Sequence, residues 1–382
     1  MAAVAAGALV AMGGLISIGD TATADPKQYS AVTGTGSDTT QDVVNALAGF
    51  TSGNTYTPVQ SSALSGKRQI ASWDATPVGT CITPKAPGAT FDRPNGSSAG
   101  RRALSRSIDG ATFGTAACGG LKAISGLVQF ARSSAGPSGA GTDLTYVPFG
   151  RDALSFAAYR SDGGAKNLNL SAAQLTSIFS TGPTVIGGLT IIPCSIQTSS
   201  GTYAFWNTAL GVTTAQMLAA TSGTAGDCFA TSGGTIQEND GNGLKAAGDA
   251  FGANTQVIIG FSAANFIAQS NGVVTSQLPL PLGTVDLGGI GALSNPYNGT
   301  APALTPDVNF YASSTFGRDV YNVLPTSVVT GLGNDDQKTL FVGSGSAVCS
   351  ALSTIQTFGF LGLGGSCGST TLQGPLVSGS AP

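Results

Sequence analysis

The chain of 382 residues contains no histidine. This absence excludes a Ser-His-Asp or Cys-His nucleophile system and every histidine-ligated zinc site. The sequence also shows no cluster of metal-ligating residues and no nucleophile beside a general base. We therefore expect a protein that is not an enzyme, that holds no metal ion and that needs no cofactor.

Charged residues are scarce as well, at 9% of the chain, whereas soluble domains usually carry about 25%. The formal net charge is −3, and the 16 Lys and Arg residues are scattered apart from the pairs Lys67-Arg68 and Arg101-Arg102. A nucleic-acid-binding protein needs a basic patch or stripe. We therefore expect no nucleic-acid partner, and a surface kept in water by hydroxyl and amide groups.

Long apolar runs are absent except at the N-terminus. Residues 2–18 are largely apolar and uncharged, and Ala22-Thr23-Ala24 before Asp25 is a small-x-small cleavage pattern. We predict a signal peptide over residues 1–24 and a secreted, extracytoplasmic protein, with a buried N-terminal helix as the alternative. No cysteine follows the run to carry a lipid, and no second stretch of about 18 apolar residues follows it, so we expect no membrane span.

Six cysteines are present, and none forms a C-x-x-C pair, which argues against a zinc ribbon or a thioredoxin-like motif. An even number in an exported chain indicates disulfides. Neighbour pairing is preferred because each bridge then closes one local loop, and free buried thiols are the alternative. The preferred pairs are Cys81–Cys118, Cys194–Cys228 and Cys349–Cys367.

Apolar patterns alternate between the strand and helix types after residue 30. We expect strands at 31–33, 127–131, 144–159, 189–193, 256–261 and 318–325. We expect helices over 43–50, 171–179 and 262–269, and others that begin near 97 and 202. Segment 271–312 is expected to be irregular, and one last helix is expected to carry Phe341, Val348, Leu352 and Ile355.

Three turns share one pattern, in which a glycine and small hydroxyl residues precede a helix. They are Gly36 to Thr40, Gly96 to Ser98, and Ser199 to Thr202. A helix N-terminus presents unsatisfied N–H groups and the positive end of the helix dipole, and adjacent hydroxyls add donors. Several such ends around one cleft would bind an oxyanion with few full charges. For each single turn, plain capping of the helix is the alternative, with Ser37 and Asp38 as N-cap candidates in the first.

These motifs, in this order, resemble those of the PstS-type phosphate-binding proteins, the receptors of phosphate ABC transporters. Residues 33–39 are similar to the family's T-G-A-G-A-T-F, and Gly96–Gly100 to its G-S-S-G-G. Phe130–Ser134 lies where the family has F-G-A-S-D, and Ser200-Gly201-Thr202 matches the S-G-T phosphate loop. The similarity spans residues 31 to 360 and is greatest to a divergent secreted branch seen in Gram-positive actinobacteria.

The resemblance implies an α/β, two-lobed type II periplasmic-binding-protein fold with crossing strands and a central cleft. Lobe 1 would comprise residues 25–150 and the returning 316–382, and lobe 2 residues 151–315. It implies a monomeric solute-binding protein with a small polar or oxyanion ligand and a possible ABC transporter permease as partner. The implied ligand contacts are Asp38, Thr39, Ser97, Ser134, Ser200, Gly201 and Thr202.

Three departures from the family pattern bear on the ligand. Asp38 replaces a threonine, Ser134 replaces the aspartate that accepts a proton from a protonated oxyanion, and Ile196 replaces an arginine. Arg132 can restore a cation, since arginine suits bidentate oxyanion contacts, or it can pair with Asp38. We expect phosphate or a related oxyanion ahead of a neutral or zwitterionic ligand.

Two further motifs have structural interpretations. Residues 238–243 faintly resemble a calcium loop but lack its ligand order, so a helix-capping turn is preferred. Arg151-Asp152 is interpreted as a structural pair near the crossover. The function expected first is capture of a solute for ABC-type uptake or scavenging. The alternative is a secreted surface or adhesion protein that reuses the fold without a role in transport.

Overall fold

The computed structural model describes residues 25–26, 32–51, 54–62, 68–77, 79–222, 228, 235–332 and 335–382. The predicted signal peptide, residues 1–24, lies outside the described residues. Among the helices of the described ranges, none is long and apolar enough to cross a membrane.

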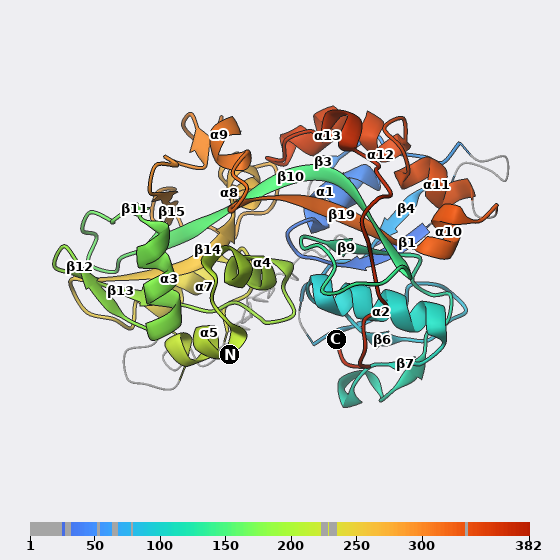
Figure 1. The fold of residues 1–382 in the computed structure, drawn as a ribbon, viewed down its shortest axis with the longest axis horizontal. Helices are drawn as coiled ribbons and strands as arrows, with labels where there is room; N and C mark the ends of the chain where they lie inside the picture. Colours follow the sequence, from blue (N-terminus) through green and yellow to red (C-terminus); the bar gives the residue numbers. More distant parts are fainter. Residues whose placement is uncertain are drawn as a thin grey trace, which may run out of the picture.

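One mixed sheet runs through the whole molecule, and two long strands cross between its halves (Figure 1). These strands, β10 (Leu144–Tyr159) and β19 (Gly317–Pro325), pair antiparallel at its centre. On one side follow β14 (Thr255–Ser262), β13 (Leu189–Pro193) and β12 (Thr184–Ile186). On the other follow β9 (Phe130–Ser133), β1 (Val32–Gly36) and β4 (Ile70–Ser72). The predicted two-lobed α/β fold with crossing strands is confirmed.

Each half has its own apolar core, and β10 contributes to both. Its first residues, Leu144 to Phe149, lie in the clusters of the half that contains β1, whereas Ala153 to Tyr159 lie in the cluster of the other half. The pairing of β10 with β19 shifts register between Pro148 and Gly150, at the same crossing point. Residues 150–152 therefore form the connection between the two halves.

Helices cover the sheet in both halves. The half with β1 contains α1 (Gln41–Leu47), α2 (Ser97–Asp109), α10 (Thr326–Thr330), α11 (Asp335–Phe341), α12 (Ala347–Ser350) and α13 (Leu352–Thr357). The other half contains α3 (Ala172–Thr181), α4 (Gly201–Leu210), α5 (Thr214–Thr221), α7 (Gly241–Gly248), α8 (Ala263–Ser270) and α9 (Val308–Tyr311).

Short strands and 3-10 turns complete the described chain. They are β2 (Phe50–Thr51), β3 (Asn54–Thr55), β5 (Cys81–Ile82), β6 (Phe91–Asp92), β7 (Thr112–Phe113), β8 (Lys122–Ala123), β11 (Asn169–Leu170), β15 (Asp286–Leu287), β16 (Gly289–Ile290), β17 (Tyr297–Asn298), β18 (Thr305–Pro306), β20 (Gln373–Gly374), and the turns Ala116–Cys118 and Gly364–Ser366. Segment 271–312, expected to be irregular, holds β15 to β18 and α9 between its loops.

Two of the predicted helix ends are confirmed by their capping bonds. Ser171 and Gln174 form a reciprocal capping box at the start of α3. Asp240 caps α7 by accepting from the backbone N–H of Gly243, as expected of a capping turn at 238–243. The single last helix is wrong, because the chain forms α11, α12 and α13 there. Gly343 adopts a positive φ of 86° and Ser346 then caps a new helix.

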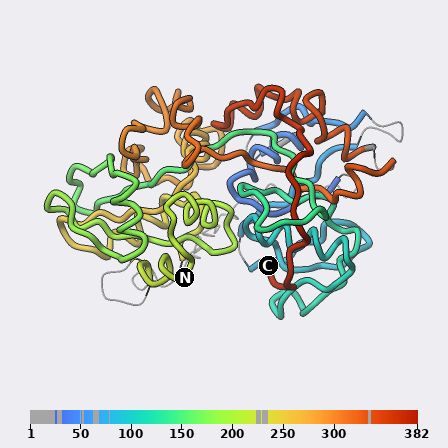
Figure 2. Tube along the Cα trace, viewed as in Figure 1, coloured from blue at the N-terminus to red at the C-terminus, as the bar shows by residue number. Residues whose placement is uncertain are grey.

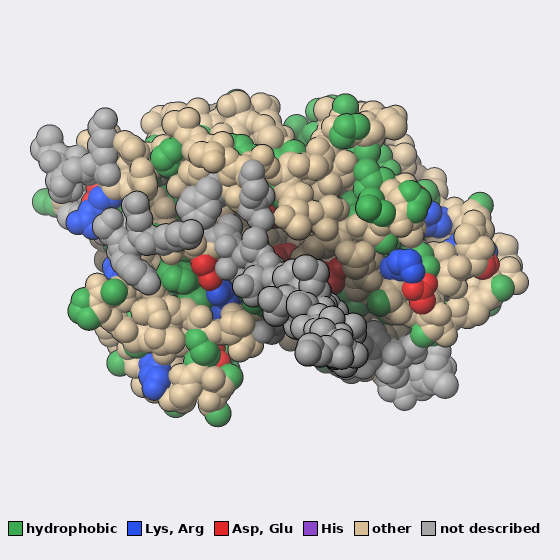
Figure 3. All heavy atoms as spheres, turned by 180° about the vertical axis from the view of Figure 1, so that it is seen from behind, with side chains coloured by type: hydrophobic (Ala, Val, Ile, Leu, Met, Phe, Trp, Pro, Cys, Tyr) green, Lys and Arg blue, Asp and Glu red, His purple; other side chains and the backbone are tan. Residues whose placement is uncertain are grey.

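The C-terminal segment lies along the first half (Figure 2). The Val377 N–H donates to Ser105 Oγ at 2.9 Å, and the Arg102 and Arg106 side chains donate to the carbonyls of Ser378 and Gly379. The surface seen from behind shows few charged side chains, and some of them lie as adjacent pairs of opposite charge (Figure 3). This agrees with the low charge of the sequence.

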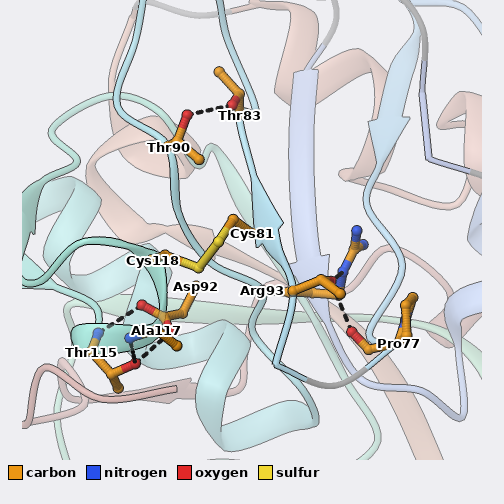
Figure 4. Close-up of a disulfide and its surroundings, with 10 residues drawn as sticks. Pro77, Cys81, Thr83, Thr90, Asp92, Arg93, Thr115, Ala117 and Cys118 are labelled. Atoms are coloured by element: carbon orange, nitrogen blue, oxygen red, sulfur yellow. Dashed lines mark hydrogen bonds between the residues drawn. A yellow bond between two sulfur atoms is a disulfide. The ribbon is translucent and has the colours of Figure 1, made fainter.

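The structure contains the three predicted disulfides: Cys81–Cys118, Cys194–Cys228 and Cys349–Cys367. Cys81–Cys118 ties β5 to the 3-10 turn Ala116–Cys118 (Figure 4). Beside it, Asp92 accepts hydrogen bonds from the backbone N–H of Thr115, at 2.6 Å, and from its hydroxyl, at 2.5 Å.

Removing this bridge is expected to destabilise the protein. The bonded residues are 37 apart in sequence, and a loop of that length limits the unfolded chain enough to contribute about 4 kcal/mol. The double variant Cys81→Ser/Cys118→Ser should lose that amount in a urea unfolding experiment. An unchanged midpoint with an unchanged slope would show that the bridge adds nothing to stability.

Candidate functional site

The three predicted turns meet where the two halves touch. The N-terminus of α2 faces the N-terminus of α4, and the Ser98 N–H donates to the Ser199 carbonyl at 3.0 Å. Two glycines make this approach possible. A Cβ on Gly96 would lie 2.5 Å from the Ser199 oxygen, and one on Gly201 would lie 2.4 Å from Ser97 Oγ. The predicted cleft is therefore closed in this structure.

A chain of buried hydroxyls lies against the start of α4. Ser134 Oγ is 3.1 Å from Ser37 Oγ and 3.2 Å from Ser97 Oγ, and the Ser134 N–H donates to Ser97 Oγ at 3.0 Å. The side chains of all three serines are inaccessible to solvent. Ser97 and Ser134, predicted from separate motifs, are thus brought together with Gly201, whose Cβ position lies 2.5 Å from Ser134 Oγ.

A second hydroxyl pair joins the two halves around Glu238. Thr39 Oγ1 and Thr202 Oγ1 lie 3.2 Å apart. Both donate to Glu238 Oε1, the bond from Thr39 being 2.5 Å long. Arg318 Nη2 donates to Thr202 Oγ1 at 2.9 Å and approaches Thr39 Oγ1 at 3.4 Å. A carboxylate oxygen, two hydroxyls and a guanidinium therefore meet at one buried point.

The guanidinium of this cluster is held by the crossing strands. Arg318 on β19 lies opposite Asp152 on β10, and its Nε and Nη2 atoms contact Asp152 Oδ2 at 3.1 and 2.8 Å. Asp152 also accepts from the Ser262 hydroxyl and from the Ala264 N–H at the start of α8. The cation is thus anchored at the hinge, within reach of both halves.

The interpretation of Arg151 and Asp152 as a pair with each other is wrong. Successive side chains on a strand point to opposite faces. Each residue pairs instead with its partner across the ladder: Arg151 with Asp319 at 2.8 Å and Asp152 with Arg318. The structural role that was expected of both residues is retained.

Glu238 and Arg318 were not among the predicted site residues. Glu238 is the only glutamate in the sequence, whereas the other acidic residues are aspartates. The single glutamate could have been proposed as a site residue from the sequence, because its side chain reaches one methylene farther than that of an aspartate. Arg318 gave no such signal, since Arg318-Asp319 within a strand pattern resembles an ordinary surface pair.

The remaining predicted residues have other partners. Arg132 donates from all three nitrogens to protein groups, namely the carbonyls of Ser37, Trp73 and Gly36 and the Ser72 hydroxyl. Arg132 therefore holds the backbone of the turns in place, and its guanidinium forms none of the bonds of the Thr39–Thr202 cluster. Asp38 accepts from the Asn239 amide at 3.1 Å. Ser200 caps α4 by accepting from the Tyr203 N–H at 3.1 Å.

Capping alone does not account for the other two turns. The N-cap of α1 is Thr40, not Ser37 or Asp38, and its side chain makes no capping bond. The N-cap of α2 is Gly96, which has no side chain to offer. The Thr39 hydroxyl contacts Thr202 and Glu238 in the opposite half, and Ser97 Oγ lies against Gly201 there.

Burial perturbs the carboxyl groups next to the cluster. Desolvation raises the pKa of Asp38 well above its usual value, and repulsion by Glu238 adds to this while the Asn239 amide opposes it. Desolvation, together with repulsion by Asp74, raises the pKa of Asp42 to about 7 against the attraction of Arg132. Among the described residues, no group of three or more His, Cys, Asp or Glu is placed to hold a metal ion.

The Asp42 shift predicts how stability changes with pH. Because the pKa of Asp42 is raised, the folded protein keeps a proton on this carboxyl that the unfolded chain releases. The free energy of unfolding is therefore highest below about pH 4 and falls as the pH rises through about 7. Asp42→Asn should therefore raise the free energy of unfolding by up to about 4 kcal/mol at pH 8 and leave it nearly unchanged at pH 4. Urea unfolding at the two pH values tests this, and equal effects at both would contradict it.

No protein-family model and no curated protein matches the chain. Several solved structures do. A putative phosphate ABC transporter substrate-binding protein with bound phosphate from Clostridium perfringens is 12% identical, with a TM-score of 0.46, over 87% of this chain and 99% of that one. An ABC-type phosphate transport receptor from Vibrio cholerae is 14% identical, with a TM-score of 0.47, over 86% and 99%. PstS from Borrelia burgdorferi is 14% identical, with a TM-score of 0.37, over 87% and 98%.

These structures are phosphate-binding proteins, the family that the sequence motifs resemble. What they bind is a property of those proteins, and the chemistry of the present site follows from its own residues. The actinobacterial branch stays a prediction.

Proposed function

We propose that the protein is an extracytoplasmic solute-binding protein that closes over a small oxyanion, phosphate or a related ion. One observation carries the proposal. Hydroxyls from opposite halves, Thr39 and Thr202, both donate to one carboxylate oxygen, and Arg318 donates to the Thr202 hydroxyl. The point where the halves meet is therefore already a receptor for an oxyanion, at present the side chain of Glu238.

The donors around this point suit a ligand with several oxygens. Ser97 and Ser134 add hydroxyls beside the start of α4, and the first turns of α2 and α4 add backbone N–H groups and the positive ends of their dipoles. Arg318 Nη1 is buried without a hydrogen-bond partner among the described residues. A buried donor left unpaired is costly, and a ligand oxygen would satisfy it.

Closure follows from the two crossing strands. Turning the halves about residues 150–152 would separate Thr39 from Thr202 and Ser97 from Gly201, and so admit the ligand. We propose lobes of 25–150 with 316–382, and of 151–315. In the same proposal Ser200 and Arg132 position the turns, and Asp38 borders the site. The protein works as a monomer that binds without turnover, and hands its ligand to an ABC transporter permease or scavenges it.

Thermal unfolding against a ligand panel tests this function. A ligand that binds only the native state raises stability by roughly 2.7 kcal/mol at a hundred times its Kd. We expect an upward shift with phosphate or a related oxyanion, and none with sugars or amino acids. A shift with a sugar or an amino acid alone would keep the class and overturn the oxyanion. No shift with any compound would favour the secreted surface or adhesion protein.

A further inference from the structure

Glu238 holds the two halves of the closed molecule together. Its Oε1 atom accepts from Thr39, which follows β1 in one half, and from Thr202, which lies on α4 in the other. The side chain is inaccessible to solvent. A single carboxylate oxygen therefore links the two halves.

The segment that carries this glutamate extends the link. Asn95 Nδ2 donates to Gln237 Oε1 at 3.0 Å, and Gln197 Nε2 donates to Asn95 Oδ1 at 3.0 Å. On the other side, Asn239 Nδ2 donates to Asp38 at 3.1 Å. Each of these bonds crosses from one half to the other. Residues 237–239 thus form a polar seam that favours closure, with Glu238 at its centre.

The bonds of Glu238 leave part of the cluster unsatisfied. Glu238 Oε2 and Arg318 Nη1 are both buried and lack hydrogen-bond partners among the described residues. The carboxylate therefore accepts from both threonines through one oxygen, and it leaves one nitrogen of Arg318 without an acceptor in the described part of the chain. A tetrahedral oxyanion has more oxygens to offer to the same donors, so an exchange of one anion for the other can be favourable.

We propose that Glu238 is a tethered competitor of the ligand: its carboxylate keeps the empty protein closed, and an oxyanion binds only by displacing it from Thr39 and Thr202. This inference rests on the proposed function. Two anions cannot share the same hydroxyl pair without strong repulsion. The ligand binds only the molecules in which Glu238 has moved away from Thr39 and Thr202. The apparent Kd is therefore the intrinsic Kd divided by the fraction of such molecules. Glu238 therefore sets how much ligand is needed for occupancy.

The variant Glu238→Gln separates the charge from the shape of the side chain. An amide oxygen accepts more weakly than a carboxylate, since charge-assisted hydrogen bonds are about twice as strong as neutral ones. The variant should bind inorganic phosphate about tenfold more tightly by titration calorimetry. In X-ray scattering, the wild type without ligand should be compact, and the variant should be larger until phosphate is added.

Asp249→Asn is the matched control, because it removes one negative charge from an exposed pair with Lys245 in the same half. It should change neither the affinity nor the scattering. Glu238→Ala controls for new hydrogen bonds that the glutamine amide could form. It should also bind phosphate more tightly than the wild type, as Glu238→Gln does.

The outcomes separate this inference from the function on which it rests. Equal or weaker phosphate binding by Glu238→Gln, with binding by the wild type intact, overturns the competitor and leaves the function standing. Failure of every variant and of the wild type to bind phosphate overturns phosphate as the ligand and the competition for it together. Scattering then still decides the closing role, which is refuted if Glu238→Gln stays as compact as the wild type.

Discussion

Gly201→Ala is expected to abolish closure and to weaken phosphate binding by about 10- to 100-fold. This loss of affinity corresponds to the free-energy cost of overpacking a tight contact. The new Cβ would lie 2.4 Å from Ser97 Oγ and 2.5 Å from Ser134 Oγ, distances that no side chain tolerates. Residue 201 begins α4 after its Ser200 cap, so the fold of that half should be unaffected. Titration calorimetry with phosphate measures the loss.

Gly252→Ala provides the control for this variant. A Cβ at Gly252 meets nothing within 4 Å, so this variant should bind phosphate as the wild type does. If Gly201→Ala also binds like the wild type, the ligand does not require the approach of α4 to Ser97 and Ser134. The contact between the two halves would then have no part in binding.

Asp152→Asn is expected to lower the free energy of unfolding by about 3 kcal/mol or more. The side chains of Asp152 and Arg318 are almost inaccessible, and loss of the carboxylate charge leaves the guanidinium buried without compensation. The hydrogen bonds from Ser262 and Ala264 would weaken at the same time. Urea unfolding at neutral pH measures the change.

Asp319→Asn is the matched comparison, because it breaks the neighbouring ion pair of the same two strands. Arg151 and Asp319 are 27% and 30% exposed, so this pair should contribute about 1 kcal/mol or less. The double variant Asp152→Asn/Arg318→Met should recover part of the loss, since no lone charge then remains buried. Equal costs for Asp152→Asn and Asp319→Asn would mean that burial of the hinge pair is unimportant.

Much of the fold is visible in the sequence because local signals decide it. The run from Leu144 to Tyr159 is buried except at Arg151 and forms the crossing strand. Ser171 and Gln174 carry their own capping signal. The last helix was mispredicted because apolar spacing continues through Gly343, where the backbone turns to a positive φ. Spacing alone does not register that break.

The site was half visible. Thr39, Ser97 and Thr202 lie in the local pattern of glycine and hydroxyl residues before a helix, and Ser134 was implied by the family resemblance. The structure brings the four residues together. The cation was expected at Arg132, which instead donates to backbone carbonyls of the turns.

The two charges at the centre of the cluster, Glu238 and Arg318, depend on contacts between distant segments. Thr39 and Glu238 lie 199 residues apart, and Thr39 and Arg318 lie 279 apart. No spacing rule within one segment predicts such a meeting, because it is set by how the halves pack.

Titration of the wild type and of Thr202→Val with inorganic phosphate tests the central claim most directly. Valine keeps the shape of threonine and removes the hydroxyl that contacts Glu238 and Arg318. We predict binding by the wild type and an affinity about tenfold lower or worse in Thr202→Val, the cost of a hydrogen bond to a charged group. Thr208→Val, on the exposed side of the same helix, should bind normally. Phosphate binding that is identical in all three proteins would place the ligand elsewhere and contradict the account.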